Sequence, residues 1–214
     1  MNKKFLFLGC HLDDIEFGCG AFISKICREK KQYDVFLLTL SEHNEDANGH
    51  LTIMRDIAEH KAACCCLTNQ EIKNDYIEKL PGQKFQYCTQ EIRELLIKYR
   101  NMINPDFVFF PSIHDIHQDH EVLANEALRI FRNSSCFGYE IIRSTKYLQP
   151  NMFVEVLYED VEKKMNAIMQ YKSQLSESAA YYFSEDLIMG ALLHYGGMCG
   201  KKYVEAFEAY SLLI

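Results

Sequence analysis

Two short polar clusters in the sequence combine residue types that bind metal ions and transfer protons. The first, residues 9–16 (GCHLDDIE), directly follows the apolar run 5–8. The second, residues 114–120 (HDIHQDH), follows the apolar run 107–110. Imidazole and carboxylate groups are ligands of zinc and related divalent ions. Open α/β sheets bind ligands at the carboxyl ends of their strands, so the two clusters predict one shared metal site.

The first cluster also has a structural interpretation. An aspartate behind a strand is often only the N-cap of the next helix, where its carboxylate accepts backbone hydrogen bonds. The second cluster favours the metal interpretation, because His117 and His120 are three residues apart at a predicted helix start. A catalytic zinc usually takes three protein ligands and leaves one position for water. His11 and one aspartate supply two ligands, and His120 or His117 supplies the third.

Other chemistries fit the sequence less well. The glycines 9, 18 and 20 have the wrong spacing for a dinucleotide-binding G-x-G-x-x-G turn. Cys10 lies beside two aspartates, which disfavour a nucleophilic thiolate. The chain has nine cysteines but no Cys-x-x-Cys pair, and the adjacent residues 64–66 would point in different directions on a helix. We therefore interpret the thiols as structural.

The composition is that of an ordinary globular protein. The chain has 214 residues, 48% of them hydrophobic and 25% charged, and a formal net charge of −7. This acidic balance argues against a nucleic-acid partner. We find no apolar segment long enough for a signal peptide or a membrane span, and we expect a cytoplasmic protein with reduced thiols.

Apolar runs and helical periodicities alternate along the chain. Strands are expected at 4–9, 33–41, 107–111, 141–142 and 153–157, with residues 41–50 forming a long loop. Helices are expected at 18–31, 51–67, 88–102, 118–132, 161–171 and 185–194, with glycine turns at 196–197 and 200 before the segment 203–207. Continuous apolar runs indicate strands buried on both faces, as in parallel sheets. We predict a single α/β domain over residues 1–214, with a Rossmann-like, mostly parallel sheet and helices on both faces.

Both clusters resemble the signatures of a known family. Residues 11–20 (HLDDIEFGCG) resemble the His-Pro-Asp-Asp-x-Glu…Gly-Cys-Gly signature of the PIG-L/LmbE deacetylases, and residues 115–120 resemble that family's His-x-Asp-His motif. Arg55 with Glu59, and the segment 203–207, are weaker similarities. The resemblance covers most of the chain and is least specific over 137–198. Leu12 replaces the usual proline, which we expect to alter packing and not chemistry.

The resemblance implies a zinc-dependent hydrolase that removes an acetyl group from an N-acetylglucosamine-type sugar. By position, it implies three metal ligands: His11, Asp14 and His120. Asp13 would be the general base, and His117 would stabilise the oxyanion or protonate the departing amine. Asp119 would orient His117 and favour its charged form. This division of roles is chemically sound, because zinc lowers the pKa of bound water to about 7 and an uncoordinated aspartate can accept its proton. Another divalent ion, such as Fe²⁺, would serve the same ligands.

Two further residues are candidates for substrate binding. Arg55 could contact an anionic or hydroxyl-rich part of the substrate, or could pair with Glu59 one helical turn on. Asp115 could contact sugar hydroxyls, or could satisfy the loop before His117. We expect the partner to be a small N-acetylated sugar or sugar conjugate.

Two alternative functions remain open from the sequence. One is a zinc amidase acting on a non-sugar amide, because the ligands do not identify the acyl acceptor. The other is a metal- or sugar-binding module without turnover. The sequence specifies neither the sugar nor the oligomeric state, and it is compatible with a homo-oligomer.

Overall fold

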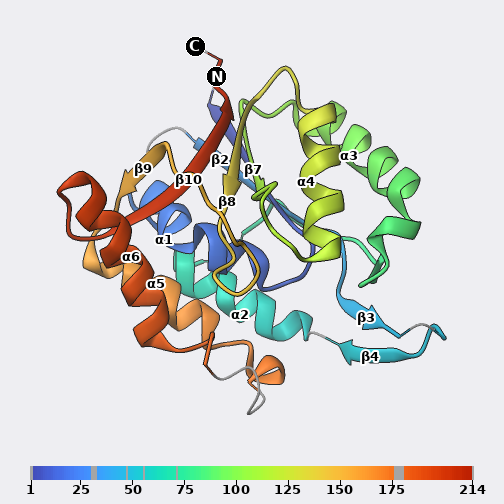
Figure 1. Cartoon of the computed structure of the whole chain (residues 1–214), viewed down its shortest axis with the longest axis horizontal. Coiled ribbons are helices and arrows are strands. Elements are labelled where there is room, and N and C mark those ends of the chain that lie inside the picture. Colours follow the sequence, from blue (N-terminus) through green and yellow to red (C-terminus); the bar gives the residue numbers. More distant parts are fainter. Residues whose placement is uncertain are drawn as a thin grey trace.

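A seven-stranded sheet forms the centre of the protein (Figure 1). The computed structural model describes residues 2–29, 33–46, 48–54, 56–70, 72–175 and 181–213. In spatial order, the strands are β5 (Asp75–Ile77), β2 (Tyr33–Thr39), β1 (Lys3–Gly9), β7 (Phe107–Pro111), β8 (Ser135–Tyr139), β10 (Val204–Ser211) and β9 (Met152–Glu155). The pairs from β5 to β8 are parallel, and β10 runs antiparallel to both β8 and β9. The predicted mostly parallel α/β sheet is confirmed.

Helices cover both faces of this sheet. On one face lie α1 (Asp14–Arg28), α2 (Ile57–Thr68) and α5 (Tyr158–Ile168), with α6 (Glu185–Cys199) against α5 and β10. On the other face lie α3 (Thr89–Ile103) and α4 (Gln118–Ile130). Two short 3₁₀ turns, η1 (Phe85–Tyr87) and η2 (Lys172–Gln174), complete the helical elements of the described residues. None of the described helices is long and apolar enough to cross a membrane.

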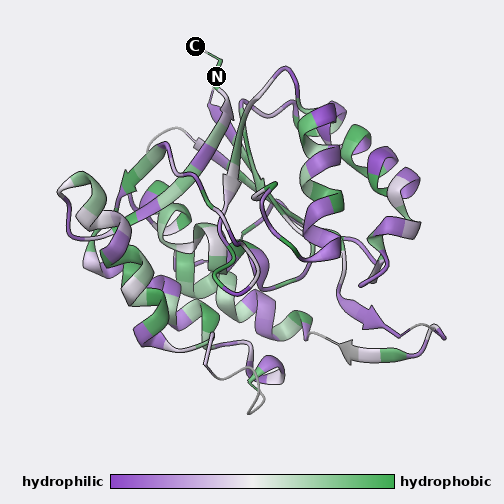
Figure 2. Ribbon diagram, in the orientation of Figure 1, coloured by the Kyte–Doolittle hydropathy of each residue, from purple (hydrophilic) through white to green (hydrophobic). Residues whose placement is uncertain are grey.

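Successive side chains of β1 enter two different cores. Phe5 and Phe7 pack with the helices of the α1 face, whereas Leu6 and Leu8 pack with α3 and α4. Side chains alternate across a strand, so a strand covered on both faces must be apolar throughout. This explains the continuous apolar run of β1. Helix α4 differs from β1, because it carries both hydrophobic and hydrophilic residues along its length (Figure 2).

Parallel pairing brings the two polar clusters to one edge of the sheet. In register, Phe7 of β1 lies opposite Phe109 of β7. The two strands run in the same direction, so their carboxyl ends lie side by side. The clusters 9–16 and 114–120 extend from these strand ends into the first turns of α1 and α4.

The segment 41–56 differs from our expectation of a loop followed by a helix. Residues His43–Glu45 form β3, which pairs antiparallel with β4 (Leu51–Met54) and parallel with β6 (Pro81–Gly82). Helix α2 begins only at Ile57, where the Asp56 carboxylate accepts a hydrogen bond from the amide of Ala58. The apolar residues of β4 are compatible with either structure, and pairing with β3 decides between them.

Three other expectations are corrected. The strand expected at 141–142 is instead β8, whose sequence SCFGY has few β-branched residues and therefore a weak strand signal. Tyr210 packs closely on Gly138 of β8, where a Cβ would lie 2.3 Å from the Tyr210 hydroxyl oxygen. Helix α1 begins at Asp14 and not at Gly18. Gly196 and Gly197 lie inside α6. The C-cap of this helix is Gly200, whose φ is 72°.

Candidate active site

Three predicted metal ligands meet beyond the ends of β1 and β7. Asp14 Oδ2 lies 3.5 Å from His11 Nδ1 and 3.3 Å from His120 Nε2. His11 follows β1, Asp14 begins α1 and His120 lies in the first turn of α4. All three side chains are buried. We call these three residues the strand-end site.

The spacing of these atoms fits a divalent metal. Ligand nitrogen and oxygen atoms about 2.0–2.1 Å from a tetrahedral zinc lie about 3.3 Å from each other. The two measured nitrogen-to-oxygen distances are 3.3 and 3.5 Å. His120 Nε2 is also buried, and it pairs with the Asp14 carboxylate at 3.3 Å without a well-aligned hydrogen bond. A buried imidazole nitrogen left in this state is available to a metal.

Asp115 lies behind His120. Its Oδ2 is 3.0 Å from His120 Nδ1 and accepts hydrogen bonds from the hydroxyls of Ser144 and Thr145. Its Oδ1 accepts the backbone amide of His117. A carboxylate on Nδ1 holds the imidazole in the tautomer that presents Nε2 to a metal. We considered Asp115 for substrate contact, but the structure buries it against a predicted ligand.

Asp119 has the equivalent position beside His11. Its Oδ2 lies 3.0 Å from His11 Nε2, and its carboxylate also accepts the backbone amides of Gln83 and Phe85. We expected this carboxylate to orient His117, but the Asp119 group that bonds to the His117 side chain is its backbone amide. Each predicted histidine ligand thus has a carboxylate on the nitrogen that faces away from Asp14.

The charges around the strand-end site favour a cation. Burial raises the pKa of Asp14, but His120 and His11 outweigh it and hold that pKa well below its usual range. Burial lowers the pKa of His120, yet Asp14 and Asp115 raise it to about 10. The carboxylates therefore stabilise positive charge at this point, whether it is carried by a proton or by a metal ion.

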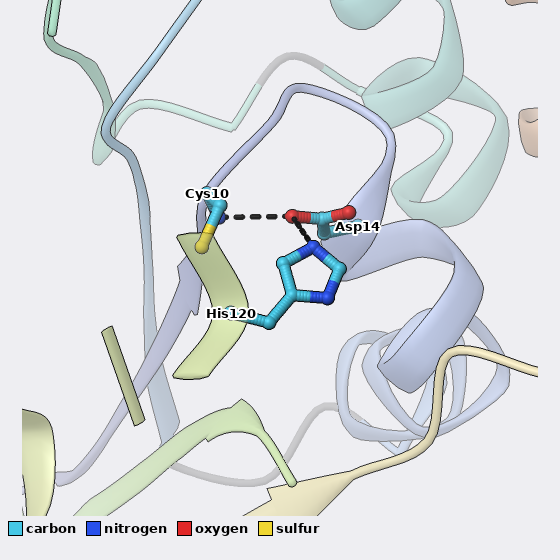
Figure 3. A group of neighbouring side chains, drawn as sticks. All are labelled: Cys10, Asp14 and His120. Atoms are coloured by element: carbon cyan, nitrogen blue, oxygen red, sulfur yellow. Dashed lines mark hydrogen bonds and ion pairs between the residues drawn. The ribbon is translucent and has the colours of Figure 1, made fainter. Parts of the chain in front are cut away.

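The two consecutive aspartates of the first cluster have different environments. Asp13 is the N-cap residue of α1, but its side chain makes no capping hydrogen bond. The Asp14 carboxylate instead accepts the backbone amides of Cys10 and His11, each at 2.9 Å. Figure 3 shows that Asp14 contacts Cys10 through this backbone nitrogen, while the sulfur lies off the line from Asp14 to His120. Asp13 lines the cavity beside these groups.

His117 presents one nitrogen to the cavity. It is the N-cap of α4, and its Nδ1 accepts the backbone amide of Asp119 at 3.2 Å. A neutral imidazole that accepts at Nδ1 carries its proton on Nε2. Burial lowers the pKa of His117 to about 4, together with the neighbouring charges of His120 and His11. The neutral ring is thus a hydrogen-bond donor at neutral pH, whereas we had expected Asp119 to favour the charged form.

A cavity of about 430 Å³ opens over the strand-end site. Its walls include residues that the sequence analysis did not select: Asn44, Gln83, Gln118, Arg143, Ser144 and Tyr182. Arg143 donates to the Tyr182 hydroxyl at 3.0 Å and lies over its ring. These residues come from β3, the first turn of α4 and separate loops, and no local pattern marks them. Arg55, our other substrate-binding candidate, lies outside the described residues.

Comparison with known proteins agrees with this geometry. The profile of the PIG-L family, described as GlcNAc-PI de-N-acetylase, matches residues 6–131. The chain belongs to the PIG-L family. The matched segment runs from β1 to the end of α4 and contains every residue of the strand-end site. Arg143 and Tyr182 lie beyond the PIG-L match, so part of the cavity wall comes from outside it.

Relatives of this PIG-L protein extend over nearly the whole chain. The uncharacterized deacetylase YaiS of Escherichia coli is 24% identical over 190 residues, covering 80% of this chain and 92% of YaiS. The N,N'-diacetylchitobiose deacetylase of Pyrococcus horikoshii has a TM-score of 0.72 at 20% identity, covering 97% of this chain and 83% of its own. The 4-carboxy-2-hydroxymuconate hydratase GalB of Pseudomonas putida has a TM-score of 0.71 at 16% identity, covering 99% and 98%. At these identities, the two structures show a shared fold.

Proposed function

We propose that this protein is a metal-dependent hydrolase that removes an N-acetyl group from an N-acetylglucosamine-type sugar or sugar conjugate, with zinc as the metal. The observation that carries the proposal is the strand-end site, where His11, Asp14 and His120 converge beside Asp13, which lines the same cavity. Membership of the PIG-L family, and relatives named as deacetylases, support this reaction over others.

Each side chain of the site has a role in amide hydrolysis. A zinc ion held by His11, Asp14 and His120 would polarise the amide and lower the pKa of the attacking water. Asp13 accepts a proton from that water as its oxygen bonds to the carbonyl carbon. His117 donates from Nε2 to the carbonyl oxygen as negative charge develops there. When the carbon–nitrogen bond breaks, Asp13 returns the proton to the departing amine, giving acetate and the free amino sugar.

The two carboxylates behind the histidines position the ligands. Asp115 holds His120, and Asp119 holds His11, each at 3.0 Å. Carboxylate partners of this kind fix the ring orientation of metal ligands and raise their basicity. We therefore assign Asp115 and Asp119 to positioning.

The cavity suits a small polar substrate. Its volume of about 430 Å³ falls within the range of about 300–1,000 Å³ that small-molecule sites occupy. Asn44, Gln83 and Arg143 line it with groups able to bond hydroxyls, and Tyr182 adds an aromatic ring. A sugar offers both hydroxyls and an apolar ring face, and we propose that it binds against these residues.

The test is release of acetate by the purified, zinc-loaded protein. We expect acetate and free amine in equal amounts from at least one of N-acetylglucosamine, N-acetylated chitin fragments, nucleotide-linked N-acetylglucosamine and N-acetylglucosaminides of other conjugates. A His11→Ala/His120→Ala variant should release none. Turnover of N-acetylated amino acids alone would indicate a non-sugar amidase. The fold also supports a hydratase, so addition of water to an unsaturated acid without acetate release would refute the proposal, as would acetate release by the metal-free variant.

A further inference from the structure

A second group of side chains with metal-ligating atoms lies between α1, α2 and β5. It consists of Glu16 on α1, His60 and Cys64 on α2, and Asp75 on β5. Glu16 and His60 are fully buried, Cys64 is 3% exposed, and the Asp75 side chain is 13% exposed. We call these four residues the Glu16 cluster. We propose that the Glu16 cluster is a second, structural zinc site. This proposal does not depend on the proposed function.

The two distances at His60 Nε2 are close to those between ligands of a tetrahedral zinc. Cys64 Sγ lies 3.6 Å from His60 Nε2 and 3.9 Å from Glu16 Oε1, and His60 Nε2 lies 3.0 Å from Asp75 Oδ2. With zinc–sulfur bonds of about 2.3 Å and zinc–nitrogen bonds of about 2.0 Å, sulfur and nitrogen ligands lie about 3.5 Å apart, and nitrogen and oxygen about 3.3 Å apart. Cys64 Sγ and Asp75 Oδ2 both lie against His60 Nε2, and the ligand atoms of Glu16, His60 and Cys64 lie within 4.8 Å of one another.

His60 is held in the orientation of a metal ligand. Its Nδ1 lies 3.1 Å from the carbonyl oxygen of Leu12 and 2.9 Å from the Tyr171 hydroxyl. Donation from Nδ1 to a backbone carbonyl leaves a lone pair on Nε2. That nitrogen is the one that faces Cys64 and Asp75. His120 has the same arrangement in the strand-end site, with Asp115 in the place of the carbonyl.

The carboxylates of the cluster are incompletely satisfied. Glu16 Oε2 and Asp75 Oδ1 are buried and have no hydrogen-bond partner among the described residues. Buried carboxylate oxygens are costly unless paired or bound to a metal. A protonated His60 would carry one positive charge against two carboxylates. A divalent ion would offset both negative charges.

A closed set of four ligands is typical of a structural site. Structural zinc is coordinated by four protein groups, whereas catalytic zinc keeps an open position. An ion in the Glu16 cluster would tie α1 to α2 and β5. Through His60 it would also brace the Leu12 carbonyl, which lies between His11 and Asp13.

The experiment first removes two predicted ligands of the strand-end site by substitution, so that any remaining zinc must bind elsewhere. Zinc content is measured in the wild type and in the double variant His11→Ala/His120→Ala. It is also measured in three triple variants, which add Cys64→Ala, Cys65→Ala or Cys10→Ala to the double variant. Cys65 is the exposed neighbour of Cys64 on the same helix. We expect about two zinc ions per wild-type chain and one in the double variant. Cys64→Ala should remove that last ion, and Cys65→Ala and Cys10→Ala should retain it.

X-ray absorption of the zinc in the double variant provides a test that needs no further substitution. We expect one sulfur among the nearest ligands. A folded double variant without zinc would overturn the proposal, and so would bound zinc without a sulfur ligand or zinc retained after Cys64→Ala. In those cases the Glu16 cluster is a metal-free network of buried ion pairs. If Cys64→Ala does not fold, the zinc content and sulfur ligation of the double variant decide the question.

Discussion

The strand-end site and the Glu16 cluster both combine histidine with carboxylate side chains on opposite sides of α1, and the Glu16 cluster adds the thiol of Cys64. Asp14 and Glu16 both lie in the first turn of α1. Successive residues of a helix are rotated by about 100°, so residues two positions apart point in nearly opposite directions. Asp14 therefore faces the cavity, and Glu16 faces α2. Both groups contain a buried histidine whose second nitrogen is held by an oxygen atom.

The difference between the two groups is access. The strand-end site borders a cavity of about 430 Å³ that Asp13 and His117 also line. In the Glu16 cluster the nearest hydroxyl, that of Tyr171, is buried and bonded to Glu16 and to the Leu12 carbonyl. Hydrolysis at a metal ion needs an open coordination position for water and a side chain that transfers a proton. A structural ion needs neither. The presence of histidine and carboxylate side chains alone therefore does not distinguish a reactive site from a structural one.

The largest effect should come from Asp13→Asn. It removes the group that accepts and returns the proton, and we expect kcat to fall about 10²–10⁴-fold. Zinc content should not change, because Asp13 is not a predicted ligand. Acetate release and zinc content are measured together, with Asp186→Asn, an exposed aspartate on α6, as the control. Loss of zinc with Asp13→Asn would instead place this residue among the ligands.

Asp115→Asn should lower the zinc affinity of the strand-end site and not that of the Glu16 cluster. It weakens the support of His120, and loss of such partners typically lowers metal affinity about 10–100-fold. Competition against a chromophoric chelator measures the affinity. We expect zinc in the Glu16 cluster to be unaffected. Unchanged affinity at the strand-end site, with a raised KM, would return Asp115 to substrate binding.

Tyr171→Phe should act on stability more than on rate. The Tyr171 hydroxyl lies 2.8 Å from Glu16 Oε1 in a fully buried environment. Losing a buried hydrogen bond to a charged group costs about 1–3 kcal/mol of the free energy of unfolding. Urea unfolding measures this loss, with Tyr87→Phe, which is 80% exposed, as the matched control. A large fall in kcat at unchanged stability would show that the buried network acts directly in catalysis.

The smallest effect should come from Arg143→Ala at the cavity wall. One hydrogen bond to substrate contributes about 0.5–1.5 kcal/mol, which corresponds to a rise in KM of about two- to tenfold. The kcat value should be retained, because Arg143 contacts neither a predicted ligand nor Asp13 in the described contacts. Steady-state kinetics of acetate release measure both constants, and Arg132→Ala, an exposed arginine after α4, is the control. A fall in kcat alone would contradict the assignment.

Much of the fold was predictable because burial imposes a period on the sequence. Strand β7 was expected at 107–111 and forms there, since both of its faces are covered. Helix α3 was expected at 88–102 and spans Thr89–Ile103. The β3–β4 hairpin and β8 were not predicted. Their short segments are compatible with several structures, and only pairing with distant strands selects one.

Residue types and their order were enough to identify the PIG-L family and the two clusters at the carboxyl ends of β1 and β7. They sufficed because the carboxyl ends of parallel strands lie at one edge of a sheet. Residues that directly follow two such strands therefore lie close together in space. The partner of each side chain was decided in three dimensions. Asp119 contacts His11, and Asp115 contacts His120. Glu16 meets His60 and Cys64 of α2, and Asp75 of β5 contacts the same His60. Hydrogen bonds and metal ligation depend on distances of a few ångströms between segments far apart in the chain, and packing of the helices on the sheet sets those distances.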